Sequence, residues 1–183
     1  MNKAFFIDKD GTLVDNSGYP KIIPTDKVLY SDVIGGLINI QKKEYKIIIF
    51  SNQPWVAKGR MSKEEVEEVF KNLIKKLSEK GIFVSDYFYC PHQSSDNCEC
   101  KKPKPKMLFD AAKKHNIDLK ESYTIGDMDD DIFAGINAGT KTILVKTGRG
   151  KDFVNDIGDK VDKILNNINE INSIIWGVYE WKT

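Results

Sequence analysis

Two aspartates lie one residue apart directly after a short apolar run near the N-terminus. The run is Ala4–Ile7, and Asp8 and Asp10 follow it. Alternate residues of a strand point to the same side, so both carboxylates are expected to face one spot. There each raises the pKa of the other unless a positive charge lies between them. The segment therefore predicts a divalent-cation site, with an ordinary polar turn as the alternative, since Asp and Gly are common turn residues.

Three further polar clusters lie beside expected strands or helices. A hydroxyl and an amide suit a phosphate oxygen, although they are also common in turns. A lysine just before a helix complements a phosphate together with the helix N-terminus, with a solvated basic loop as the alternative. Several carboxylates close together need a cation or a lysine nearby. The clusters are Ser51 with Asn52 after the expected strand 46–50, Lys101 with Lys102 before the helix 106–116, and Asp127 to Asp131 after the strand 123–125.

The cysteines of the chain are gathered in one segment. Cys90, Cys98 and Cys100 are the three cysteines of the sequence, and His92 is one of its two histidines. Three cysteines and one histidine form a known structural zinc set, whereas disulfide pairing would leave one thiol over. The segment predicts a zinc-binding loop, and the alternative is a loop with incidental thiols.

Strand and helix patterns alternate along the chain. Such alternation predicts an α/β fold with three layers, α/β/α, around a mostly parallel sheet, and ligands bind such sheets at the carboxyl ends of the strands. The expected strands are 4–7, 46–50, 84–90, 123–125 and 142–145. The expected helices are 32–43, 106–116, 130–138 and one that begins at a capping box at Ser62 and ends at Gly81.

The last part of the chain has apolar residues at helical spacing from Asp156 onward. They are Val161, Ile164, Leu165, Ile168, Ile171 and Ile175, followed by Trp176, Tyr179 and Trp181. We expect a C-terminal helix that closes the core, with a homodimer contact through this helix as the alternative to a monomer. The length of 183 residues fits one domain, 1–183.

Composition excludes several classes of partner. The net charge is +1, which gives no field that implies nucleic acid or an acidic membrane. No apolar stretch approaches the length of a membrane span. Because Met1 runs straight into a strand without a signal-peptide pattern, we expect a cytoplasmic location.

Taken together, these motifs resemble the haloacid dehalogenase (HAD) superfamily, and within it the small zinc-loop phosphatases. Four ordered motifs and the cysteine loop carry the resemblance, which covers residues 1–150 and leaves the tail 151–183 outside it. It implies a Rossmann-like fold without a large cap domain.

The resemblance also implies a reaction. Asp8 would attack phosphorus to give an aspartyl-phosphate, and Asp10 would protonate the leaving oxygen and then deprotonate water. Asp8, the Asp10 backbone carbonyl and Asp127 would hold Mg²⁺.

The same resemblance implies roles for the remaining polar groups. Ser51 and Asn52 would bind the transferred phosphoryl group, Lys102 would neutralise it, and Asp131 would orient that lysine. Lys101 stands where the family commonly has a substrate-contacting Arg, and the two side chains are not equivalent at bidentate sites. Zn²⁺ on the three cysteines and His92 would be structural and would shape the loop that carries both lysines.

The implied substrate is a small-molecule phosphate ester. The segment Ser51–Gly59 favours a sugar phosphate, namely D-glycero-D-manno-heptose 1,7-bisphosphate with removal of its 7-phosphate. The short spacing between His92 and Cys98 favours histidinol phosphate as the alternative. A non-catalytic zinc-bearing interaction module and a nucleic-acid end phosphatase are further alternatives; the intact acidic motifs argue against the first and the near-zero net charge against the second.

Overall fold

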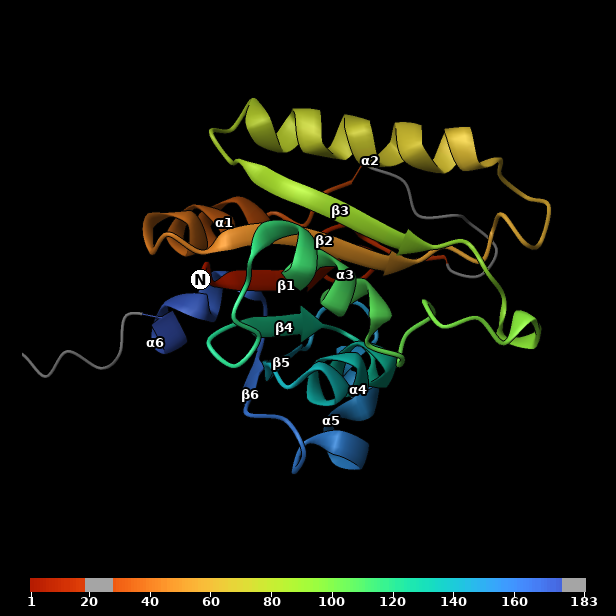
Figure 1. The fold of residues 1–183 in the computed structure, drawn as a ribbon. Coiled ribbons are helices and arrows are strands. Elements are labelled where there is room, and N and C mark those ends of the chain that lie inside the picture. Colours follow the sequence, from red (N-terminus) through yellow and green to blue (C-terminus); the bar gives the residue numbers. More distant parts are fainter. Residues whose placement is uncertain (19–27, 176–183) are drawn as a thin grey trace, which may run out of the picture.

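The computed structural model describes residues 1–18 and 28–175. At its centre lies a six-stranded parallel sheet with the strand order β3-β2-β1-β4-β5-β6 (Figure 1). The strands are β1 (Ala4–Asp8), β2 (Lys46–Asn52), β3 (Val84–Cys90), β4 (Tyr123–Gly126), β5 (Lys141–Val145) and β6 (Lys163–Leu165). This architecture confirms the predicted α/β class.

The strands are apolar because both faces of the sheet are covered. In β1, Phe5 and Ile7 belong to one buried cluster, whereas Ala4 and Phe6 belong to another on the opposite face. All four are 0% exposed. A strand buried on both sides needs a continuous apolar run instead of an alternating one, and this is the pattern seen in the sequence.

Helices from two different parts of the chain cover the two faces. Helices α1 and α2 share a core cluster on one face, and α3 and α4 share one on the other. The helices are α1 (Val33–Lys42), α2 (Lys63–Ser78), α3 (Lys106–His115), α4 (Asp129–Ala138), α5 (Gly150–Ile157) and α6 (Asn172–Ile175), with short 3-10 turns at η1 (Ser94–Asp96) and η2 (Ile168–Ile171). Figure 1 shows α2 lying along β3 at one end of the sheet.

The capping box predicted before α2 is confirmed. The Ser62 hydroxyl accepts a hydrogen bond from the Glu65 backbone N–H at 3.0 Å, and the Glu65 carboxylate accepts one from the Ser62 N–H at 2.7 Å. In the described residues, the connection from β2 to β3 contributes α2 as its one helix, so this connection places no cap domain over the sheet edge.

The single C-terminal helix expected from Asp156 is wrong. Helix α5 begins earlier and ends at Ile157, and the chain then forms the edge strand β6, which pairs with β5. Asp162 fixes this strand, because its carboxylate accepts hydrogen bonds from the Thr142 backbone N–H at 2.7 Å and from its hydroxyl at 3.0 Å. The apolar residues do close the core: Leu165, Ile168 and Ile171 are buried. Trp176, Tyr179 and Trp181, on which the dimer alternative partly rests, lie outside the described residues.

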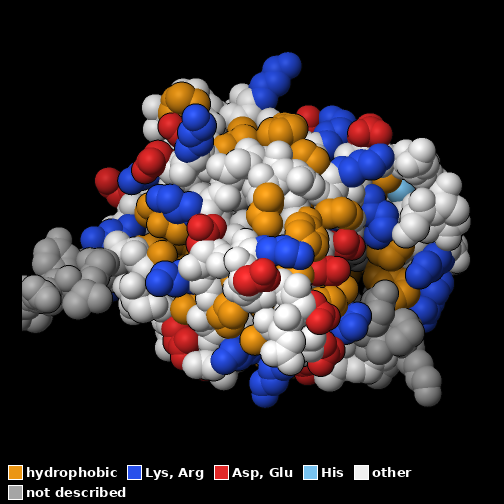
Figure 2. All heavy atoms as spheres, turned by 90° about the horizontal axis from the view of Figure 1, so that it is seen from below, with side chains coloured by type: hydrophobic (Ala, Val, Ile, Leu, Met, Phe, Trp, Pro, Cys, Tyr) orange, Lys and Arg blue, Asp and Glu red, His pale blue; other side chains and the backbone are white. Residues whose placement is uncertain are grey.

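The surface carries both signs of charge. On the face shown in Figure 2, Lys and Arg side chains are interspersed with Asp and Glu side chains, so this face has no continuous basic track for a nucleic-acid backbone. No helix in residues 1–18 and 28–175 has the length and apolar character that crossing a membrane requires.

Candidate active site

A pocket lies at the carboxyl ends of β1, β2 and β4, where ligands bind in parallel sheets. Every catalytic, substrate-binding and magnesium residue predicted from the sequence lines this pocket. Its lining consists of Asp8, Asp10, Asn16, Ser51, Asn52, Pro54, Trp55, Lys101, Lys102, Asp127, Met128, Asp130, Asp131 and Arg149. The structure therefore brings together predicted residues from four separate parts of the sequence, and Arg149 adds a fifth.

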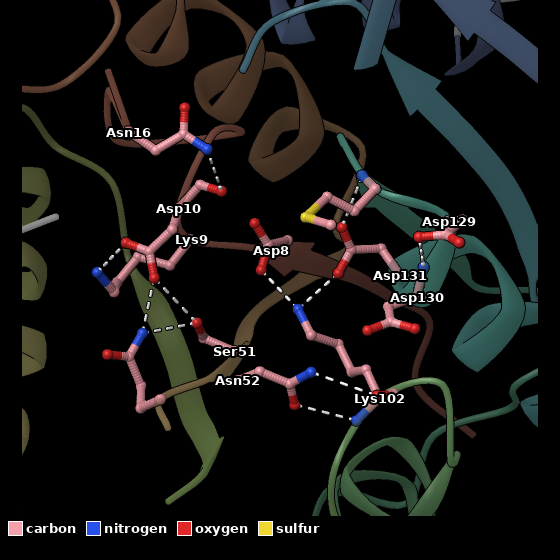
Figure 3. Close-up of polar contacts among 12 residues, drawn as sticks. Asp8, Lys9, Asp10, Asn16, Ser51, Asn52, Lys102, Asp129, Asp130 and Asp131 are labelled. Carbon is pink, nitrogen blue, oxygen red and sulfur yellow. Dashed lines mark hydrogen bonds and ion pairs between the residues drawn. The ribbon is translucent and has the colours of Figure 1, made fainter. Parts of the chain in front are cut away.

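Lys102 lies between two carboxylates in the floor of the pocket (Figure 3). Its ammonium donates to Asp8 Oδ1 at 2.6 Å and to Asp131 Oδ1 at 2.5 Å, and its side chain is 4% exposed. Burial alone would lower the pKa of Lys102, but the negative charges of Asp131 and Asp8 outweigh it and raise the pKa. The lysine is therefore a fixed positive charge beside Asp8.

Asn52 holds the backbone of the same lysine. Its side-chain oxygen accepts the Lys102 N–H at 3.0 Å, and its amide donates to the Lys102 carbonyl at 3.3 Å. This pair of bonds connects the end of β2 to the loop before α3 (Figure 3). It sets the point from which the lysine side chain enters the pocket.

Two carboxylate oxygens beside Lys102 have no hydrogen-bond partner among the described residues. They are Asp8 Oδ2 and Asp127 Oδ1, and both are buried. The second oxygen of Asp127 accepts the Arg149 N–H at 2.8 Å. Asp131 belongs to the same group of acidic side chains, but its oxygens are occupied by Lys102 and by the Met128 N–H. Buried carboxylate oxygens without partners are costly, and they suit a hard cation.

The pKa values support this interpretation. Burial, with the neighbouring charge of Asp131, raises the pKa of Asp8 well above its ordinary value, even though Lys102 opposes the rise. The same two causes raise the pKa of Asp127 to about 7, against a lowering contribution from the Arg149 N–H. Lys102 alone does not offset the negative charge of this pair, and a divalent cation held by the two free oxygens would supply further positive charge.

Two glycines allow the chain to pass close to Asp127. A Cβ atom at Gly11 or at Gly148 would lie 2.2 Å from Asp127 Oδ2, and both residues have positive φ, +100° and +52°. Neither position accommodates a larger residue without displacing the carboxylate. The turn after β1 and the loop after β5 therefore enclose Asp127 from two sides.

The Asp10 side chain points away from Asp8 and Lys102 (Figure 3). Its carboxylate accepts hydrogen bonds from Lys9, from Gln53 Nε2 at 2.7 Å and from Ser51 Oγ at 3.2 Å. The expectation that both side chains of the motif face one spot is therefore wrong. Asp10 lies beyond the end of β1, where the alternation of side chains along a strand no longer applies.

The four residues of the predicted zinc loop also come together. Their ligand atoms lie within 4.8 Å of one another. Cys100 Sγ is 3.0 Å from Cys90 Sγ and 3.6 Å from Cys98 Sγ, and His92 Nδ1 is 3.3 Å from Cys100 Sγ. Zn–S bonds of about 2.3 Å in a tetrahedron place sulfur atoms roughly 3.8 Å apart. The distances from Cys98 to Cys90 and Cys100, 3.5 and 3.6 Å, are near this value, and the distance between Cys90 and Cys100 is shorter.

Three residues near the acidic motif received no role from the sequence. Lys9 and Gln53 contact Asp10, and Arg149 contacts Asp127 through its backbone. Arg149 follows β5, so the rule that parallel strands bring their carboxyl ends together would have found it. No sequence signal separated Lys9 and Gln53 from ordinary turn residues.

Comparison with known proteins agrees with this geometry. A family model described as HAD-hydrolase-like matches residues 99–171. A curated relative from Pasteurella multocida, named D-glycero-beta-D-manno-heptose-1,7-bisphosphate 7-phosphatase, is 33% identical over 97% of this chain and 99% of its own length. The chain belongs to the HAD-like phosphatases.

Further matches agree on the fold and differ in substrate anomer. A relative of this HAD-like phosphatase from Photorhabdus laumondii, named for the alpha anomer of the same heptose bisphosphate, is 38% identical over 80% of this chain and 84% of its own length. The crystal structure of the D,D-heptose 1,7-bisphosphate phosphatase from B. bronchiseptica, in complex with magnesium and phosphate, superposes with a TM-score of 0.84 at 22% identity. It covers 93% of this chain and 96% of its own.

Proposed function

We propose that this HAD-like phosphatase is a Mg²⁺-dependent enzyme that removes the 7-phosphate from D-glycero-D-manno-heptose 1,7-bisphosphate. The observation that carries the proposal is the arrangement of two partnerless, buried carboxylate oxygens, on Asp8 and Asp127, beside the charged Lys102. The names of the curated relatives support this substrate and do not favour histidinol phosphate.

Asp8 and Lys102 divide the phosphoryl-transfer step between them. An oxygen of Asp8 attacks phosphorus, the bond to the sugar oxygen breaks, and an aspartyl-phosphate forms. Lys102 offsets the charge of the transferred group, and Asp131 orients its ammonium through the 2.5 Å contact. Phosphoryl transfer depends mainly on such positioning and charge stabilisation.

The residues that fit Mg²⁺ are Asp8, Asp127 and the backbone carbonyl of Asp10. When bound, the ion supplies Lewis-acid stabilisation of the phosphoryl oxygens. The carbonyl oxygen of Asp10 also accepts a hydrogen bond from Asn16 at 3.4 Å. Asp10 itself gives a proton to the leaving sugar oxygen and later takes one from water.

Residues of the pocket wall bind the substrate. Ser51 lines the subsite of the transferred phosphoryl group, and Asn52 holds Lys102 against it. Lys101, at the same wall, contacts the rest of the substrate. Zn²⁺ in the cysteine loop holds the segment that precedes both lysines. We further place the enzyme in the cytoplasm, where thiols stay reduced and available as ligands.

The test is phosphate release with Mg²⁺ from both heptose bisphosphate anomers, histidinol phosphate and several sugar monophosphates, with phosphorus NMR to assign the position lost. We expect one heptose anomer to be preferred, loss of its 7-phosphate, and no turnover by the Asp8→Asn variant. A preference for histidinol phosphate, or undiminished turnover by the variant, would contradict the proposal.

A further inference from the structure

Lys9 is a charged side chain with no exposed surface. It lies between the two aspartates of the N-terminal motif, and its ammonium contacts the Asp10 carboxylate. The Phe70 ring of α2 lies 5.8 Å from the ammonium. A fully buried lysine is rare and costly unless it is paired. Burial of Lys9 therefore costs folding free energy, which its contact with Asp10 offsets.

Donors converge on the Asp10 carboxylate from several sides. Lys9 donates to Oδ1, whereas Gln53 at 2.7 Å and Ser51 at 3.2 Å donate to Oδ2. Gln53 also donates to the Ser51 hydroxyl at 2.8 Å and is itself 3% exposed. These donors hold the Asp10 carboxylate against Ser51 at the pocket wall, on the side away from Asp8 and Lys102 (Figure 3).

Lys9 and Gln53 reach Asp10 from behind the pocket. The described pocket lining includes Asp10 and Ser51, but neither Lys9 nor Gln53. Lys9 is 0% and Gln53 3% exposed, so both act on the pocket through the residues that line it. An effect of Lys9 on the reaction passes through Asp10, whereas an effect of Gln53 passes through Asp10 or through Ser51.

We propose that Lys9, assisted by Gln53, is a positioning residue that holds Asp10 for proton transfer in both halves of the reaction. This inference rests on the proposed function. In the first half, Asp8 attacks phosphorus and the sugar oxygen leaves with the electron pair of its bond and the proton of Asp10. Lys9 then stabilises the Asp10 anion that remains. In the second half, water attacks the aspartyl-phosphate, its proton returns to Asp10, and Asp8 leaves as a carboxylate.

A substrate that needs no proton on its leaving group separates these two halves. From 4-nitrophenyl phosphate, the aryl oxygen departs as a stable phenolate, so Asp8 becomes phosphorylated without help from Asp10. Release of phosphate still needs Asp10 as the base. With 4-nitrophenyl phosphate, a defect in holding Asp10 therefore slows only the second half of the reaction. With a sugar phosphate, the same defect slows both halves.

The experiment compares Lys9→Met, of similar length and without charge, with wild type in rapid-mixing assays. We expect a burst of 4-nitrophenolate equal to the enzyme concentration, followed by steady turnover about 10-fold or more below wild type. With the heptose bisphosphate we expect slow product release and no burst. Lys9→Arg keeps the charge and should restore most of the steady rate. The matched control is Lys71→Met, an exposed lysine next to Phe70 on α2.

Asp10→Asn distinguishes failure of this inference from failure of the proposed function. It should give the same burst, because it removes the base itself; if it gives none, the assigned role of Asp10 and the inference fail together. The inference alone is overturned if Asp10→Asn gives the burst while Lys9→Met behaves as wild type. It is also overturned if Asp10→Asn gives the burst while Lys9→Met loses burst and steady rate in equal measure. Gln53→Leu is the second variant should Lys9→Met not fold, and it should show a weaker burst pattern.

Discussion

The two clusters that suit a metal ion differ in how much of each ligand is already used. In the acidic cluster, Asp8 and Asp127 each keep one buried oxygen without a partner among the described residues. In the cysteine cluster, the four ligand atoms of Cys90, His92, Cys98 and Cys100 face one another. The acidic cluster leaves positions for substrate oxygens, whereas the cysteine cluster is closed by its own ligands.

This difference supports the proposed catalytic role of the acidic cluster and the proposed structural role of the cysteine cluster. The two are joined through Lys102, which follows Cys100 by two residues and pairs with Asp8 in the acidic cluster. On the proposed function, the closed cluster would hold the loop from which the open one obtains its positive charge. Removing a ligand from one cluster should therefore leave metal binding at the other cluster close to wild type.

The largest effect is expected from Asp127→Asn, which keeps the shape of the side chain and removes its charge. Because a bound metal contributes several kcal/mol of transition-state stabilisation, kcat/KM should fall by about 100-fold or more. Mg²⁺ titration should show weakened binding, while metal analysis should show zinc at the wild-type level. Loss of zinc from this variant would mean that the two clusters are not independent.

A smaller effect is expected from Cys100→Ser. Structural zinc contributes directly to folding free energy, so this variant should lose zinc and melt at a lower temperature. Turnover should fall by about 10-fold because the loop no longer holds Lys102 firmly, an effect of the size seen for residues that support a site. The Mg²⁺ affinity should stay close to wild type.

The matched control for this variant is Ser95→Ala, an exposed change in the same loop that removes no ligand. It should keep zinc, stability and turnover. If Cys100→Ser were fully active without zinc, the supporting role of the closed cluster would be wrong.

Much of the site was predictable because parallel strands end at one edge of the sheet. Asp8, Ser51 and Asp127 follow three different strands in the sequence, and the topology alone brings them together. The cysteine loop was predictable because its ligands are close in the sequence. In both cases the signal lies in residue type combined with position relative to a strand.

The parts that were not predicted depend on contacts between distant or ambiguous segments. Ile164 and Leu165 fit a helical period, yet they form a strand because β5 offers an open edge and Asp162 binds Thr142. Lys9 resembles a surface lysine in the sequence, and only the packing of Phe70 over it shows that it is buried. Neither the spacing of apolar residues nor the residue type shows which edge of the sheet is open or which charged side chain is buried.

The smallest expected effect is a dependence of Mg²⁺ binding to the acidic cluster on pH. The pKa of Asp127 is raised to about 7 in the metal-free protein, so below that pH Mg²⁺ must displace a proton from Asp127, and the raised pKa of Asp8 adds to this competition. The apparent Kd for Mg²⁺ should therefore rise by roughly tenfold or more for each pH unit below about 7. Calorimetric titration between about pH 5.5 and 8.5 measures this, and zinc content in the same samples serves as the internal reference. A Kd that does not change with pH would show that Asp127 is ionised before the metal arrives, so that Lys102 already supplies the charge assigned to the cation.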